Sequence, residues 1–120
     1  MHKQNNRRIG AQAEQLIRKY LSEQGYTILE MNYRCRQGEV DIIARHGQYY
    51  VFIEVKYRSS AQYGAPEEAV GISKQRRISR AALYYLYSHH LPEATPVRFD
   101  VAAIDGQQIR YIQNAFEYIN

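Results

Sequence analysis

The chain has 120 residues, of which 45% are hydrophobic and 23% are charged; this is the composition of an ordinary globular protein and excludes a disordered or fibrous chain. Sixteen Lys and Arg residues against 12 Asp and Glu residues give a net charge of +4. No apolar run approaches the roughly 20 residues that a membrane span requires. The length predicts one domain over residues 1–120, and the lone Cys35 without a signal-peptide pattern indicates a cytoplasmic protein.

Apolar residues at helical spacing predict a first amphipathic helix over residues 8–24, which Gly25 ends. Glu14 borders the apolar stripe of this helix, because it lies only some 60° around the axis from Ile17. Its carboxylate can point into a site under the helix, or it can form an ion pair with Arg18 at the i+4 spacing. Taken alone, the residues favour the ion pair.

Two neighbouring apolar runs carry charged residues at their centres. After an expected strand over residues 26–33 and a basic turn over 34–38, hairpin strands are expected over residues 38–44 and 51–57. A type II′ turn with Gly47 and Gln48 at its centre places Asp41 opposite Glu54 and Glu39 opposite Lys56. A turn centred on His46 and Gly47 instead places Glu39 opposite Glu54. In both registers, alternation puts the acids and Lys56 on one face, and the other face carries Val40, Ile42, Ala44, Val51, Ile53 and Val55.

The sequence of the second half of the chain predicts helices followed by a β-hairpin. A polar loop over residues 58–65 leads to a short helix from Pro66 to about Val70, and Ser73 is expected to cap a longer helix that runs to about His89. Strands are expected over residues 97–104 and 108–113, joined by a tight turn at Asp105 and Gly106. The predicted order is α-β-β-β-α-β-β.

Several stretches together resemble one known family over nearly the whole chain. The chain is similar to the YraN-like endonuclease family, which resembles archaeal Holliday-junction resolvases and the PD-(D/E)xK nucleases. The matching stretches are residues 10–14, 25–26, 32–34, 38–43, 52–58 and 63–64, Lys74, and residues 98–101. The chain departs from the expected pattern at Ala13, where a glycine is usual, and at Val40, which replaces the nominal proline.

The resemblance implies an α/β (α+β) fold with a mixed sheet flanked by helices, the core of restriction-endonuclease-like proteins. It also maps the catalytic motif onto Asp41, Glu54 and Lys56, with Glu14 as the helix glutamate of the resolvase branch. Without the resemblance, an acid followed by Glu-x-Lys is more typical of an exposed charged face of an antiparallel sheet.

The implied chemistry is metal-dependent hydrolysis of a phosphodiester bond. Asp41 and Glu54 supply hard oxygen ligands that suit Mg, with Mn as a possible substitute, and the Val55 carbonyl is a candidate third ligand. Lys56 would stabilise developing negative charge. Glu39 is left open between a salt bridge to Lys56 or Arg58 and contact with the metal.

The charge distribution predicts a nucleic-acid partner, because phosphates bind clustered cations, and the resemblance to resolvases implies that this partner is DNA. The candidate nucleic-acid-binding residues are Arg34, Arg36, Arg58, Tyr63, Lys74, Arg76, Arg77 and Arg80. A solvated helix face explains the cluster over residues 74–80 equally well. The sequence therefore favours an endonuclease for branched or structured DNA, with a non-catalytic nucleic-acid-binding accessory protein as the alternative; a homodimer is expected only by analogy with resolvases.

Overall fold

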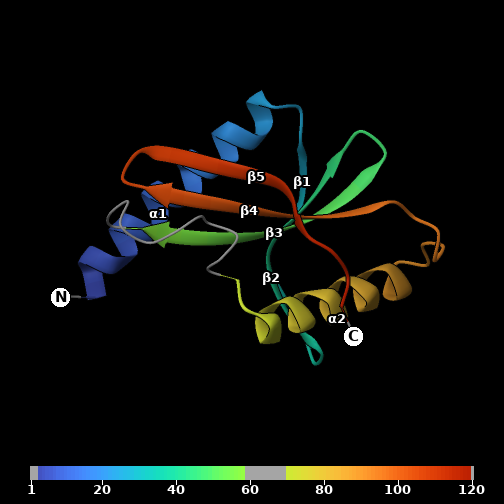
Figure 1. Cartoon of the computed structure of the whole chain (residues 1–120). Coiled ribbons are helices and arrows are strands. Elements are labelled where there is room, and N and C mark those ends of the chain that lie inside the picture. Colours follow the sequence, from blue (N-terminus) through green and yellow to red (C-terminus); the bar gives the residue numbers. More distant parts are fainter. Residues whose placement is uncertain (1–2, 59–69, 120) are drawn as a thin grey trace.

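The computed structural model describes the backbone of residues 3–58 and 70–119, and side chains from Gly10 to Tyr57 and from Val70 to Ile119. The elements follow the predicted α-β-β-β-α-β-β order and form an α+β fold (Figure 1). They are α1 (Lys3–Glu23), β1 (Thr27–Cys35), β2 (Gly38–His46), β3 (Tyr49–Arg58), α2 (Ile72–Ser88), β4 (Val97–Asp105) and β5 (Gln108–Phe116).

The five strands form one mixed sheet in the order β1-β2-β3-β4-β5. All neighbours are antiparallel except β3 and β4, which are parallel because α2 carries the chain back across the sheet. The helices lie on opposite faces of the sheet (Figure 1). Each helix buries its apolar stripe, with Ile17 and Leu21 on α1 and Ile78 and Tyr85 on α2. No helix in the described ranges is both long and apolar enough to cross a membrane.

The boundaries of the elements differ from the sequence predictions, most clearly in α1, β1, α2 and β5. Helix α1 begins earlier, at Lys3, and β1 continues through Cys35, so the predicted basic turn is shortened to residues 36–37. Strand β5 extends to Phe116, and its turn is centred on residues 106–107 because Asp105 pairs with Gln108. The predicted Ser73 cap is wrong: Gly71 is the N-cap residue of α2 and no side chain caps the helix. The expected helix from Pro66 lies almost entirely outside the described residues.

The β2–β3 hairpin adopts the first of the two predicted registers. His46 pairs with Tyr49 and Ile42 with Ile53, so Gly47 and Gln48 form the turn. Gly47 has φ 62°, whereas the φ angle of Gln48 is not positive. Positive φ at the first central position alone is the requirement of a type II′ turn. Asp41 and Glu54 therefore occupy the next opposed positions beyond Ile42 and Ile53.

The regular alternation of side chains between the two faces of β2 breaks at Asp41. The predicted apolar layer on one face of the hairpin is therefore wrong at Val40. Ile42 packs in the cluster under α1 as expected, but Val40 packs in the cluster under α2. Opposite Asp41 on β1, Asn32 has φ 55°, a left-handed conformation that regular strands do not contain. The backbone pairing of β2 with β3 also ends at Ile42. The strands thus diverge at the position of the candidate catalytic aspartate.

Gly38 is required where the start of β2 passes α2. A Cβ atom at this position would overlap the carbonyl oxygen of Arg77. Backbone atoms of a packed helix cannot yield cheaply, so Gly38→Ala is expected to lower the free energy of unfolding by about 1–3 kcal/mol. Urea unfolding measures the change. Gly10→Ala is the control, since a Cβ at Gly10 meets nothing within 4 Å; equal stabilities for the two variants would contradict the predicted close contact.

Candidate active site

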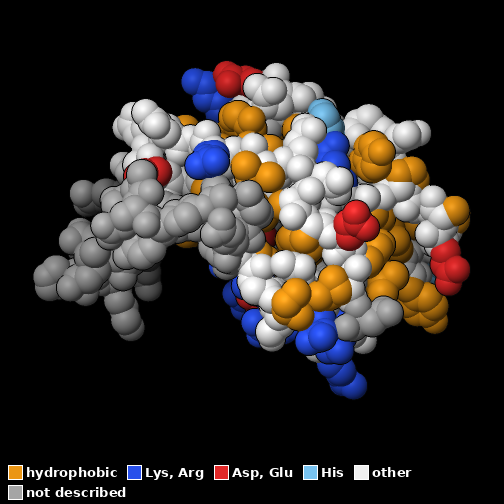
Figure 2. All heavy atoms as spheres, viewed as in Figure 1, with side chains coloured by type: hydrophobic (Ala, Val, Ile, Leu, Met, Phe, Trp, Pro, Cys, Tyr) orange, Lys and Arg blue, Asp and Glu red, His pale blue; other side chains and the backbone are white. Residues whose placement is uncertain are grey.

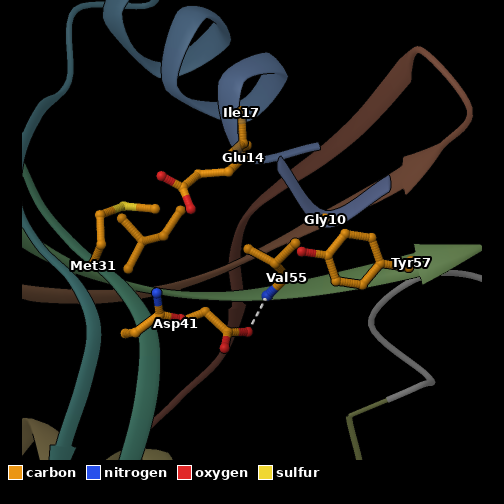
Figure 3. A pocket seen from close by; sticks show the side chains of 9 residues that line it. Gly10, Glu14, Ile17, Met31, Asp41, Val55 and Tyr57 are labelled. Carbon is orange, nitrogen blue, oxygen red and sulfur yellow. Dashed lines mark hydrogen bonds between the residues drawn. The ribbon is translucent and has the colours of Figure 1, made fainter. Parts of the chain in front are cut away.

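Asp41 lies where β2 and β3 separate, on the wall of a pocket of about 120 Å³ (Figure 3). Its Oδ2 atom accepts a hydrogen bond of 2.8 Å from the Val55 amide. The carboxylate thus satisfies a backbone donor that the interrupted ladder leaves unpaired. Glu14 and Ile17 of α1 line the same pocket, so the divergence of the strands opens a polar space under the first helix.

Glu54 is the second acid of the site, and its side chain is almost fully buried, with 3% of the residue exposed. Lys56 Nζ lies 3.4 Å and Lys74 Nζ lies 3.3 Å from the same oxygen, Oε2. Burial raises the pKa of Glu54, and the nearby negative charge of Asp41 raises it further, whereas the two ammonium groups lower it. Two acids and two lysines therefore converge at this point.

Glu14 faces the pocket but also forms the predicted ion pair, with Arg18 Nε 3.1 Å from Glu14 Oε2. The carboxylate of Glu14 points into the space above Asp41 and Val55 (Figure 3). Tyr57 is largely exposed, yet its hydroxyl end points toward the same space. Burial, followed by the negative charges of Asp41 and Glu14, raises the pKa of Tyr57. The pocket has room for ordered water, which needs only about 10–15 Å³ per molecule.

Glu39 does not join the site, although alternation predicts that it faces Lys56. Its carboxylate lies 4.0 Å from Arg34, and both side chains are mostly exposed. The break at Asp41 accounts for the difference, because residues on either side of the break no longer keep one alternation. The predicted pairing of Glu39 with Lys56 is wrong: Glu39 pairs with Arg34, and Lys56 pairs with Glu54. The side chain of Arg58 and all of Tyr63 lie outside the described part of the chain.

The predicted basic residues fall into two groups. Lys74 turns toward Glu54 and belongs to the site. The exposed residues Arg76, Arg77 and Arg80 lie on the outer side of α2. Because Gly38 packs against the backbone at Arg77, the β1–β2 turn with the exposed Arg36 lies beside this part of the helix. Arg34 precedes that turn on β1.

The oxygen atoms of the candidate site are of the kind that binds a small hard cation, but the protein supplies only a few of them. Carboxylate oxygens of Asp41 and Glu54, together with the Val55 carbonyl, are the ligand types that magnesium takes alongside water. Among the described residues, no three His, Cys, Asp or Glu side chains form a metal-binding group. Any metal here would thus be held by two carboxylates, with backbone and solvent oxygens supplying the rest.

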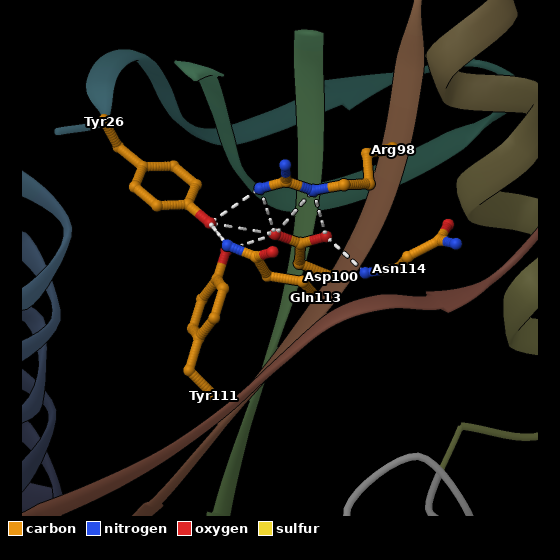
Figure 4. Close-up of polar contacts among 6 residues, drawn as sticks. All are labelled: Tyr26, Arg98, Asp100, Tyr111, Gln113 and Asn114. Carbon is orange, nitrogen blue, oxygen red and sulfur yellow. Dashed lines mark hydrogen bonds and ion pairs between the residues drawn. The ribbon is translucent and has the colours of Figure 1, made fainter. Parts of the chain in front are cut away.

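Another acid, Asp100, lies inside an apolar strand, but its carboxylate is enclosed in a network of hydrogen bonds (Figure 4). Asp100 on β4 is fully buried, and its carboxylate accepts hydrogen bonds from Arg98, Tyr26, Tyr111 and the Asn114 amide. Burial and the charge of Asp100 raise the pKa of Tyr111 far above its usual range, so the phenol stays protonated and donates. Sequence reasoning assigned no role to Asp100, although its position within the apolar run at 97–104 was the available signal.

Comparisons with known proteins place the chain in a family. A family model described as "Uncharacterised protein family UPF0102" matches residues 13–104. A UPF0102 protein of Lachnoclostridium phytofermentans is 59% identical over 98 residues, covering 82% of this chain and 83% of the relative. One from Syntrophus aciditrophicus is 51% identical over 116 residues (93% and 91%), and one from Geobacter metallireducens is 49% identical over 117 residues (94% and 95%).

The matched stretch contains Glu14, Asp41, Glu54, Lys56 and Lys74. These findings confirm the family resemblance that the sequence motifs indicated. The chain belongs to the UPF0102 family.

Proposed function

We propose that this protein is a magnesium-dependent endonuclease that hydrolyses phosphodiester bonds in branched or structured DNA. The observation that carries the proposal is the convergence of Asp41 and Glu54 where two strands separate, with two lysines on the Glu54 carboxylate. Burying like charges together is costly unless cations compensate them. Metal-dependent hydrolysis of a phosphodiester uses such a combination of hard oxygen ligands and nearby positive charge.

Each side chain of the site has a separate role in the proposed reaction. Asp41 and Glu54, with the Val55 carbonyl, would hold the metal, and manganese is expected to substitute for magnesium. When bound, the metal supplies positive charge that activates water and polarises the phosphate. Lys56 lies beside these carboxylates and stabilises negative charge that develops on the phosphoryl oxygens. Glu14 orients water in the pocket that it shares with Asp41.

A second function, a non-catalytic accessory protein that binds nucleic acid, is favoured by a different observation. The two acids and two lysines balance in charge, and both lysines lie on one oxygen of Glu54. A self-compensated cluster of this kind can persist without a metal. Under this alternative, the basic residues bind DNA while the cluster contributes only to the fold.

Cleavage of labelled DNA distinguishes the two functions. Branched, flapped, single-stranded and duplex substrates would be incubated with magnesium, manganese or EDTA. Asp41→Asn and Glu54→Gln are expected to abolish cleavage while DNA binding is retained, and Glu39→Gln serves as the control because Glu39 lies outside the site. Absence of cleavage by the wild-type protein in either metal, with binding intact in all variants, would overturn the nuclease and support the accessory role.

A further inference from the structure

Helix α2 combines exposed cations and exposed tyrosines on its outer side. Across its 17 residues it carries Lys74, Arg76, Arg77 and Arg80 but no Asp or Glu. Tyr84 is 39% exposed and Tyr87 is 79% exposed. In Figure 2, basic and hydrophobic side chains gather along the lower edge of the molecule, where Figure 1 places α2. The helix thus offers positive charge and flat apolar rings to the same partner.

The spacing puts these groups on one stripe. At 100° per residue, Arg77, Arg80, Tyr84 and Tyr87 fall within an arc of about 80° and extend over about 15 Å of the helix axis. The opposite side of α2 carries the buried residues Ile78, Ala81, Ala82, Tyr85 and Leu86. We call Arg77, Arg80, Tyr84 and Tyr87 the outer stripe; all four residues are exposed, and Arg77 lies at the edge of the stripe beside the β1–β2 turn.

The two tyrosines of the outer stripe differ from the buried and half-buried ones. Tyr26, Tyr33, Tyr85 and Tyr111 all pack against other aromatic rings. Neither Tyr84 nor Tyr87 has a ring contact among the residues that the structure describes. A tyrosine that is 79% exposed leaves most of its ring available for stacking.

We propose that the outer stripe binds single-stranded nucleic acid, with Arg77 and Arg80 on phosphates and Tyr84 and Tyr87 stacked on bases. Charge complementarity selects this occupant, because a helix with four cations and no anion suits a polyanion. Exposed rings favour a single strand over a duplex, in which the base faces are already stacked. RNA and DNA share this chemistry, so both belong in the test.

The stripe would extend the candidate active site. Lys74, near the start of α2, lies 3.3 Å from Glu54, so a strand that leaves the site can continue along the same helix. This path rests on the proposed function, which brings a phosphodiester to Glu54. It predicts that the substrate has an unpaired segment beside the cleaved bond, as branched and flapped DNA do.

Fluorescence anisotropy in EDTA measures the binding without cleavage. The probes are labelled oligo(dT), oligo(rU) and the duplex of oligo(dA) with oligo(dT). The double variant Tyr84→Ser/Tyr87→Ser is expected to bind at least one single-stranded probe about tenfold more weakly or worse, with little change for the duplex. Arg80→Gln is expected to weaken binding of all probes and to reduce the salt dependence for single strands by about 0.7 in the log–log slope.

Matched controls separate stacking from general apolar or charge effects. Leu83→Ser removes a 51% exposed apolar side chain from the same helix without removing a ring. Lys19→Gln removes one exposed cation from α1, on the other face of the sheet. Both are expected to bind as the wild type does, and circular dichroism melting checks that all variants fold.

Three outcomes would overturn the inference. They are unchanged single-strand affinity in the tyrosine double variant, an equal loss for Leu83→Ser, and a homodimer in sedimentation that the tyrosine changes dissociate. Failure of the nuclease proposal is separate. If the wild-type protein cleaves no substrate but its binding depends on the two tyrosines, the nuclease proposal fails and the binding role of the outer stripe stands. If the double variant cleaves and binds normally, the binding role of the outer stripe fails and the nuclease proposal stands.

Discussion

Asp100→Asn is expected to lower the free energy of unfolding by about 3 kcal/mol, since it breaks a buried charge pair and leaves the other charge uncompensated. Arg98 Nη2 lies 2.9 Å from Asp100 Oδ2, and the side chain of Arg98 is 11% exposed. An asparagine also presents NH₂ hydrogens where the carboxylate accepted donors. The network joins the start of β1 to β4 and β5 through Tyr26, Arg98 and Tyr111, so its loss affects three strands.

Urea unfolding and thermal melting measure the effect of Asp100→Asn, with Asp105→Asn as the matched control. Asp105 lies at the end of the same strand and is exposed. Its replacement is expected to change stability by less than about 0.5 kcal/mol. A melting temperature of Asp100→Asn equal to that of the wild type would show that the network contributes little to stability.

Lys56→Ala is expected to slow DNA cleavage by about 10²- to 10³-fold, the size of effect seen when one preorganised charge-stabilising group is removed. The variant should still fold, because Lys74 remains 3.3 Å from Glu54 and compensates the buried carboxylate. The magnesium concentration for half-maximal cleavage should change little, since an ammonium group is no metal ligand.

Single-turnover rates over a magnesium titration separate the two effects of Lys56→Ala. Lys19→Gln is the control for loss of one positive charge from an exposed residue that does not line the candidate pocket. A variant whose rate is restored by high magnesium would place Lys56 in metal or substrate binding instead of the chemical step. A rate equal to that of the wild type would exclude Lys56 from catalysis.

The order of elements could be predicted from the sequence because local patterns determine it. Gly25 has φ 88° at the end of α1, and Gly47 has φ 62° in the hairpin turn, as their positions in the sequence indicated. The N-terminus of α2 could not be predicted in the same way. Ser73 is a common capping residue, yet the helix begins at Ile72 after an extended Gly71.

The faces of the strands were harder to predict than their order. Alternation holds for Ile42 and Ala44 but fails at Val40, because the pairing of β2 with β3 ends at Ile42 and Asn32 adopts a left-handed conformation. Such a break depends on contacts between strands distant in sequence. Period-two reasoning therefore put Glu39 on the same face as the candidate site, whereas the structure places it beside Arg34.

Local sequence also could not distinguish Asp41 from Asp100. Both aspartates lie within apolar strands at positions where the strand pairing is irregular. The side chain of each accepts a hydrogen bond from a backbone amide. Asp41 opens onto a pocket, whereas side-chain donors from Tyr26, Arg98 and Tyr111 surround Asp100. Only the fold brings those donors together, and only the fold brings Lys74 to Glu54.

A crystal grown with manganese tests most directly whether Asp41 and Glu54 hold a metal. The anomalous difference map is expected to show one or more peaks between the two carboxylates, within coordinating distance of the Val55 carbonyl. Crystals of Asp41→Asn under the same conditions should lack the peaks. A map without anomalous density at these carboxylates, with Lys56 and Lys74 still paired to Glu54, would contradict the proposed metal-dependent site.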